Sequence, residues 1–135
     1  MASVIYPKWK QLIVGLGCGS GTKPTGTLKA QIVDAADYTY DAGHDYLDDV
    51  PAGARVGTAV EITNPTFTLG VLDGDNVTWA SVTGDVSEAV VVYLDTGTAG
   101  TSPLICYQDS GTGLPVTPNG NNIIGSWNAS GICAI

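Results

Sequence analysis

The sequence predicts a mainly β protein, folded as a single-domain β-sandwich or partly closed barrel with a short N-terminal helix. Three observations support this prediction. The chain has 135 residues, which is the length of one compact domain. Its eighteen glycines and its low share of charged residues, 13%, favour short strands joined by tight turns. Short apolar stretches also recur between polar turn clusters, as they do in sandwiches and barrels.

Residues 1–14 are predicted to form the helical segment. Ile5, Trp9, Leu12 and Ile13 have the spacing of one helical face. Ser3 is placed to cap the first turn. Residues 15–27 follow as a surface loop, because this stretch holds too many glycines for regular structure.

Residues 28–135 are predicted to form the β domain. Alternating side chains indicate a half-buried strand at 28–33, and an irregular segment rich in Asp and Tyr follows it. Further strands are expected at residues 58–62, 67–72, 77–82, 89–94, 104–108 and 123–127. The strands 89–94 and 104–108 should form the central hairpin, because three consecutive valines are typical of a strand buried on both faces.

The charge balance argues against nucleic-acid binding. The chain has five basic and thirteen acidic residues, so it lacks the positive surface that a phosphate backbone requires. Its apolar stretches are far shorter than the ~20 residues that cross a bilayer, so no membrane partner is expected. The N-terminus lacks the regions of a secretory signal, and we expect synthesis in a cytoplasm and use without cleavage.

Catalysis is not expected. His44 is the single histidine of the chain, and no Gly-x-Ser-x-Gly turn after a strand supplies a nucleophile for it. No cofactor motif is present either. We therefore predict a protein that is not an enzyme, without catalytic or cofactor-binding residues.

Acidic residues cluster in two places and raise the question of Ca²⁺ binding. Their spacing does not match the twelve-residue calcium loop, and aspartates in turns usually accept hydrogen bonds from their own backbone. No metal site is assigned, although Ca²⁺ binding stays open. The clusters consist of Asp34, Asp37, Asp41, Asp45, Asp48 and Asp49, and of the turn at residues 73–76.

The three cysteines are too scattered for a zinc site. Cys106 and Cys133 lie in apolar stretches typical of buried, reduced thiols. Cys18 lies among glycines and is expected to be exposed. An odd cysteine count leaves at least one thiol without a partner in the chain. We hypothesise that Cys18 can form an interchain disulfide outside the reducing cell, and an idle surface thiol is the alternative.

Aromatic residues suggest where recognition could occur. Irregular, aromatic loops on a rigid sheet commonly bind partners, so the predicted interaction surface combines the N-terminal segment with residues 34–56. It consists of Trp9, Tyr38, Tyr40, His44 and Tyr46. A sugar-binding platform is a second possibility, although core packing is the favoured interpretation. The platform would consist of Trp9, Trp79, Trp127, Tyr38, Tyr40 and Tyr46.

Several stretches, in order along most of the chain, resemble a family of small structural proteins of tailed-phage virions. The stretches are IYPK at 5–8, IVDAADYTY at 32–40, DYLDDVPAGARV at 45–56, VLDGDNVTW at 71–79, VTGD at 82–85, AVVVYLDTGT at 89–98 and GLPVTPNG at 113–120. The resemblance implies a component of the virion head, neck or tail.

The leading expectation from this resemblance is a capsid decoration or cement protein on the outer shell. It would act as a homo-oligomer and bind the major capsid protein. A neck, collar or tail component, bound to other virion proteins, is the alternative within the same class. A host-surface carbohydrate-binding module built on the tyrosine-rich segment is the alternative from another class.

Overall fold

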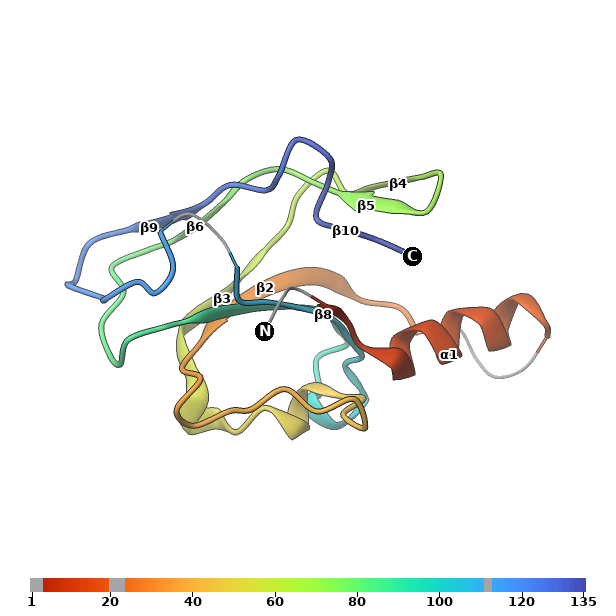
Figure 1. The fold of residues 1–135 in the computed structure, drawn as a ribbon, viewed down its shortest axis with the longest axis horizontal. Coiled ribbons are helices and arrows are strands. Elements are labelled where there is room, and N and C mark those ends of the chain that lie inside the picture. The colour runs from red at the N-terminus through yellow and green to blue at the C-terminus, as the bar shows by residue number, and fades with distance from the viewer. Residues whose placement is uncertain (1–3, 20–23, 111–112) are drawn as a thin grey trace.

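Five antiparallel strands form the central sheet (Figure 1). The computed structural model describes residues 4–19, 24–110 and 113–135. The strand β7 (Ala89–Asp95) lies between β8 (Leu104–Gln108) and β2 (Thr27–Val33), which confirms the predicted central hairpin of residues 89–94 and 104–108. In spatial order the strands are β1 (Val4–Ile5), β8 (Leu104–Gln108), β7 (Ala89–Asp95), β2 (Thr27–Val33) and β3 (Arg55–Glu61).

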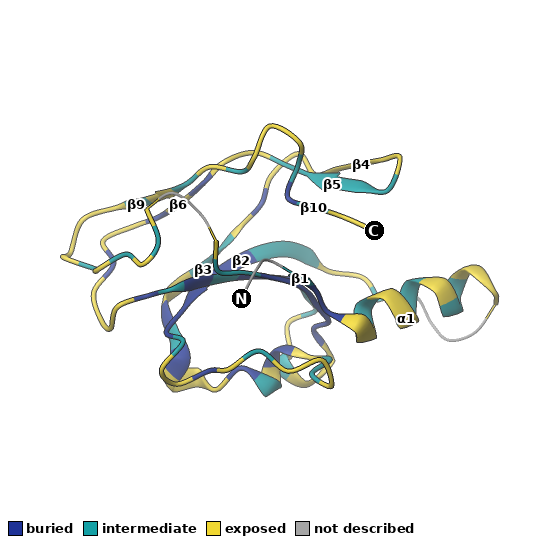
Figure 2. Ribbon diagram, in the orientation of Figure 1, coloured by how far each residue is buried: buried dark blue, intermediate teal, exposed yellow. Residues whose placement is uncertain are grey.

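The two faces of this sheet bury different side chains, because successive residues of a strand point to opposite faces. Val92 of β7 packs with Ala30 and Ile32 of β2 in one apolar cluster. Val91 and Tyr93 belong to a second cluster on the other face. Both faces are therefore covered, and Figure 2 shows buried residues along the central strands.

Two small antiparallel sheets cover the first face. One consists of β10 (Cys133–Ala134), β5 (Val71–Asp73) and β4 (Thr66–Thr68), and the other of β6 (Val77–Trp79) and β9 (Ile123–Gly125). Trp79 is the largest fully buried side chain and packs in the cluster shared with the central sheet. The packed sheets confirm the mainly β, sandwich-like prediction, and the described residues form no closed barrel.

An irregular segment, residues 34–54, covers the second face. It contains two short 3₁₀ helices, η1 (Leu47–Asp49) and η2 (Ala52–Ala54), and η1 contacts a third, η3 (Ala99–Thr101). Leu47, Val50 and Ala54 are buried against the sheet. The segment that the sequence marks as irregular is thus a packed layer.

The helix α1 (Pro7–Gly17) differs from the predicted segment 1–14 at both ends. Pro7 is its first residue, a position where the missing N–H has no intrahelical partner to lose. Ile5 lies in β1, paired with Cys106, and so does not share the helical face of Trp9. Ser3, the predicted cap, lies outside the described residues. The predicted loop begins too early at residue 15, because residues 15–17 are helical.

None of the helices in the described ranges has the length and hydrophobicity required to span a bilayer.

The predicted strand 67–72 is wrong, because β4 and β5 are separate strands of a tight hairpin. Leu69 and Gly70 form the turn, with φ of 52° and 79°. Two residues with positive φ produce the turn that suits the twist of a hairpin. The predicted strands at 77–82 and 123–127 end earlier, at Trp79 and Gly125.

β3 contains a bulge opposite Gln31. Ala30 pairs with Val60 and Ile32 with Val56, so β3 has extra residues between the two pairs. Gly57 has a φ of 67° there, which glycine adopts without steric cost. The buried Gln31 donates a hydrogen bond from Nε2 to the Val56 carbonyl oxygen, 2.7 Å away.

Candidate interaction surfaces

A cluster of aromatic rings lies between the central sheet and residues 34–54. The hydroxyl oxygens of Tyr6 and Tyr38 are 2.7 Å apart, and the Tyr38 hydroxyl is 3.0 Å from Nδ1 of His44. Tyr40 packs on Tyr6 and Tyr107, with ring centroids 5.1 and 5.7 Å apart. Only 3% of Tyr38 is exposed, so its predicted place on an interaction surface is wrong. His44 and Tyr40 are half-buried at the edge of the cluster.

Burial changes the acidity of these hydroxyls. Burial, followed by the hydrogen bond to Tyr38, raises the pKa of Tyr6 far above its ordinary value. Burial also raises the pKa of Tyr38 to about 12. Both hydroxyls therefore stay neutral at physiological pH, and their hydrogen bonds hold residues 34–54 on the sheet.

A groove of about 340 Å³ runs between α1 and the start of η1. It places Trp9 close to Tyr46, two residues of the predicted surface that are far apart in the sequence. Tyr46 is 36% exposed, and Trp9 is half-buried. The groove is lined by Lys8, Trp9, Gln11, Leu12, Gly15, Asp45, Tyr46 and Pro103.

Asp45 and Asp49 form a pair of neighbouring carboxyl groups beside this groove. Burial and the neighbouring Asp49 raise the pKa of Asp45. Burial opposes ionisation of Asp49 as well, but backbone N–H groups of Asp45 and Tyr46 donate to it and lower its pKa. Its Oδ2 accepts from the Asp45 N–H at 2.9 Å, so Asp49 fixes the loop that carries Tyr46.

A second, more apolar groove of about 420 Å³ lies along the other side of α1. Trp9 separates the two grooves and lines both. Ile13 and Leu16 of the helix face Leu94 at the end of β7 across this groove. The remaining lining residues are Pro24, Thr25 and Gly26.

The tip of the β4–β5 hairpin presents apolar side chains to solvent. Leu69 is 98% exposed and Phe67 is 59% exposed. Ile135 lies next to them, because its N–H donates to the Gly70 carbonyl oxygen at 2.9 Å. β4 is an edge strand whose three residues are all exposed. The sequence interpretation misses this surface because it treats residues 67–72 as one strand. The Leu69–Gly70 pair is the signal that could have revealed the turn.

Three aspartates lie together at the end of β2. Carboxylate oxygens of Asp34, Asp37 and Asp85 lie within 4.8 Å of one another. Asp85 comes from the loop before β7, whereas the other predicted acidic residues do not join this group of described residues. Oδ1 of Asp34 accepts a hydrogen bond from the Ala36 N–H, as in the turns expected from the sequence. These contacts assign no metal ion.

The three cysteines have different environments. Cys18 is exposed at the C-terminal end of α1, as predicted. Cys106 is buried, and its thiol is hydrogen-bonded with that of half-buried Cys133. This bond, together with burial, raises the pKa of Cys106, and the same bond lowers the pKa of Cys133. The interchain disulfide through Cys18 stays a prediction, which non-reducing electrophoresis of assembled protein would test.

No protein-family model matches the chain, and no curated protein matches it. The resemblance to phage structural proteins therefore remains a prediction.

Proposed function

We propose that the protein is a non-enzymatic structural subunit of a tailed-phage virion, and that it decorates the outer shell of the capsid. The observation that carries this proposal is the exposed apolar tip of the β4–β5 hairpin, above all Leu69 at 98% exposure. The resemblance of most of the chain to virion structural proteins supports the same conclusion.

The hairpin tip suits contact with another protein. A leucine with a φ of 52° is unusual, and such backbone costs of order 1–3 kcal/mol. Its side chain gains nothing from the chain's own core, because it is almost fully exposed. Burial of an exposed leucine side chain against a partner is favourable by a free energy of about 2 kcal/mol.

The partner under this proposal is protein rather than nucleic acid, because the formal net charge is -8. The major capsid protein is the partner of a decoration protein, and neck or tail proteins are the partners in the alternative placement. The subunit would be made in the host cytoplasm and act in the virion as a homo-oligomer.

Quantitative mass spectrometry of purified virions of the phage that would encode this chain tests the proposal. A decoration protein should be present at on the order of hundreds of copies per particle, whereas a neck ring holds about a dozen. Absence of the chain from purified particles would overturn the proposal. The variant Leu69→Asp should reduce its copy number, while Thr83→Asp, an exposed position away from the tip, should not.

Carbohydrate binding is a second candidate, favoured by the groove that holds Trp9 and Tyr46 beside polar side chains. Aromatic faces with a few polar groups are typical of ligand grooves. Glycan binding by the intact chain should fall when Tyr46→Ala is introduced and persist in Phe67→Ala, which removes an exposed ring outside the groove. Absence of glycan binding by the unmodified chain removes this candidate.

A further inference from the structure

The helix α1, here called the arm, lies in the basic N-terminal part of the sequence, and residues 27–135 form an acidic body. Residues 1–26 contain three lysines and no acidic residue. Residues 27–135 contain two basic and all thirteen acidic residues, a formal charge of -11. Residues 1–26 of one copy are therefore attracted electrostatically to residues 27–135 of another copy.

The arm packs on its own body through Trp9, which lies against both apolar clusters of the central sheet. None of the residues of α1 is buried, and Figure 2 shows the helix as exposed or half-buried along its length. The side chain of the N-cap residue Tyr6 bonds to Tyr38 and gives the helix no capping hydrogen bond. A helix of eleven residues is marginal without such support.

The charge of the arm also lacks compensation. Lys8 and Lys10 lie in the first turns of α1, where they add to the positive end of the helix dipole, and the first turn has no acidic residue. Neither lysine forms an ion pair with another described residue, whereas Lys29 is paired with Asp95 at 2.7 Å. Carboxylates from outside would therefore stabilise the arm.

The apolar side chains of the arm are also incompletely buried. Ile13 and Leu16 line the second groove and are only half-buried, and Val14 is 61% exposed. A partner that covers this helix must therefore offer both apolar contact and negative charge.

We propose that α1 docks on the acidic body of a second copy of this chain. The apolar stripe of Ile13 and Leu16 is covered in this contact, and Lys8 and Lys10 approach carboxylates of the neighbour. In naming a second copy, the inference rests on the proposed role as an oligomeric structural subunit. Charge complementarity selects the occupant, because every copy carries both the helix with Lys8 and Lys10 and the -11 body.

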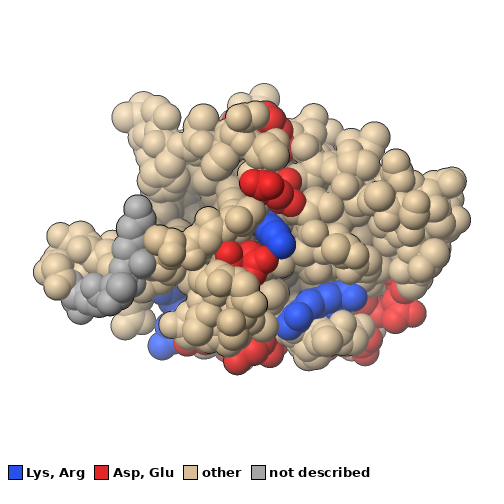
Figure 3. Space-filling model, turned by 180° about the vertical axis from the view of Figure 1, so that it is seen from behind, with Lys and Arg blue, Asp and Glu red and all other residues tan. Residues whose placement is uncertain are grey.

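The positions of α1 and of the acidic body predict how neighbouring copies are arranged. α1 extends from one end of the molecule, where β2 begins, and β2 then runs to the opposite end (Figure 1). Figure 3 shows acidic side chains across the body, including the end opposite the arm. A contact between different surfaces is head to tail, so it closes a ring or extends a chain of subunits.

Sedimentation velocity of the purified full chain tests this inference. The chain should associate at about 0.1 M NaCl and dissociate towards monomer at about 1 M, because the Debye length falls from about 10 Å to about 3 Å. Lys8→Gln with Lys10→Gln should weaken association by about tenfold. The control Lys8→Arg with Lys10→Arg keeps both positive charges of the arm, and it should associate like the unmodified chain.

Zero-length carbodiimide cross-linking of a mixture of ¹⁴N and ¹⁵N chains then locates the contact. Mixed-isotope peptides that join Lys8 or Lys10 to an acidic residue of the body are expected. A monomer under all conditions, an unaffected lysine variant, or linkage only within one chain would overturn the inference. Binding of monomers to anionic lipid vesicles without self-association would also overturn it, by assigning the arm to a membrane. These results do not depend on particle composition, so failure here is distinct from failure of the proposed function.

Discussion

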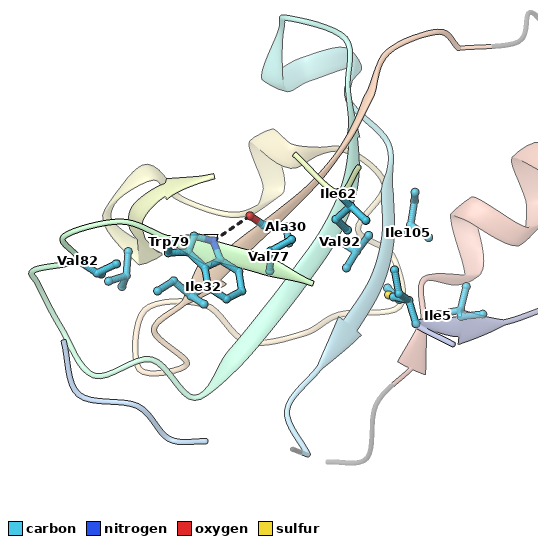
Figure 4. Packing of buried hydrophobic residues seen from close by; sticks show 12 residues of the cluster. Ile5, Ala30, Ile32, Ile62, Val77, Trp79, Val82, Val92 and Ile105 are labelled. Carbon is cyan, nitrogen blue, oxygen red and sulfur yellow. Dashed lines mark hydrogen bonds between the residues drawn. The ribbon is translucent and has the colours of Figure 1, made fainter. Parts of the chain in front are cut away.

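Nε1 of Trp79 donates a hydrogen bond to the carbonyl oxygen of Ala30, 3.2 Å away, and so joins the upper sheets to the central sheet (Figure 4). Ala30 lies beside the bulge of β3, where ladder hydrogen bonding is disrupted. Gly125 of β9 lies against the same ring, because a Cβ there would be 2.8 Å from the indole. One side chain thus fixes the spacing of two layers.

Trp79→Phe should lower the free energy of unfolding by about 2–3 kcal/mol. The change leaves a void and removes the donor to the buried Ala30 carbonyl. Urea unfolding followed by circular dichroism measures the loss. Trp127→Phe is the matched control, since its Nε1 donates to the Asp75 carbonyl oxygen at an exposed site, and it should cost less than about 1.5 kcal/mol. Equal losses for the two variants would contradict the assigned role of Trp79.

Gly57→Ala should destabilise the protein by about 1 kcal/mol or more. A φ of 67° strains any residue with a Cβ, and the added atom would lie 3.3 Å from Val82. Gly53→Ala adds the same methyl group where nothing lies within 4 Å, so it should leave stability nearly unchanged. Thermal unfolding of both variants compares them, and an unaffected Gly57→Ala would show that the bulge relaxes.

Much of the fold follows from the sequence because its central strands are long and strongly patterned. The strand Leu104–Gln108 has the predicted bounds, and three consecutive valines mark β7 as central. The two-residue strands β1 and β10 depend on partners far along the chain, and two residues carry no readable alternation. The hairpin of β4 and β5 is hidden because Leu69, an apolar residue, occupies a turn position normally held by Asn or Asp.

The candidate surfaces follow from the sequence only in part. Trp9 and Tyr46 line one groove, and their place on an interaction surface stays a prediction. Tyr38, like Tyr46, is an aromatic residue of the irregular segment. It is nevertheless buried, because its ring packs against Tyr107 of the central sheet. Periodicity cannot separate these two tyrosines, since both lie in a segment without regular structure.

Stability should fall at alkaline pH. Tyr38 has an ordinary pKa of 10.0 and a pKa of about 12 when folded, so the folded state favours the neutral hydroxyl. Its contribution is therefore complete below pH 10 and is lost as the pH rises from 10 to about 12. Urea unfolding across this interval measures the slope. In Tyr38→Phe the free energy of unfolding should fall less steeply with pH, and an unchanged slope would contradict the burial of this hydroxyl.

The cysteines should react with a thiol reagent in a fixed order. Cys18 is exposed and should be modified first. Cys133 is half-buried with a lowered pKa, so it should follow. Cys106 should react only on unfolding, because burial and its hydrogen bond raise its pKa. Mass spectrometry of timed samples gives the order, and early labelling of Cys106 would contradict the buried thiol pair.

A reconstruction of the purified virion tests the proposed structural role most directly. We expect repeated density for this chain on the outer shell, with the Leu69 tip and α1 buried against neighbouring subunits. A virion whose density lacks this chain, or holds it with both elements facing solvent, would contradict the account.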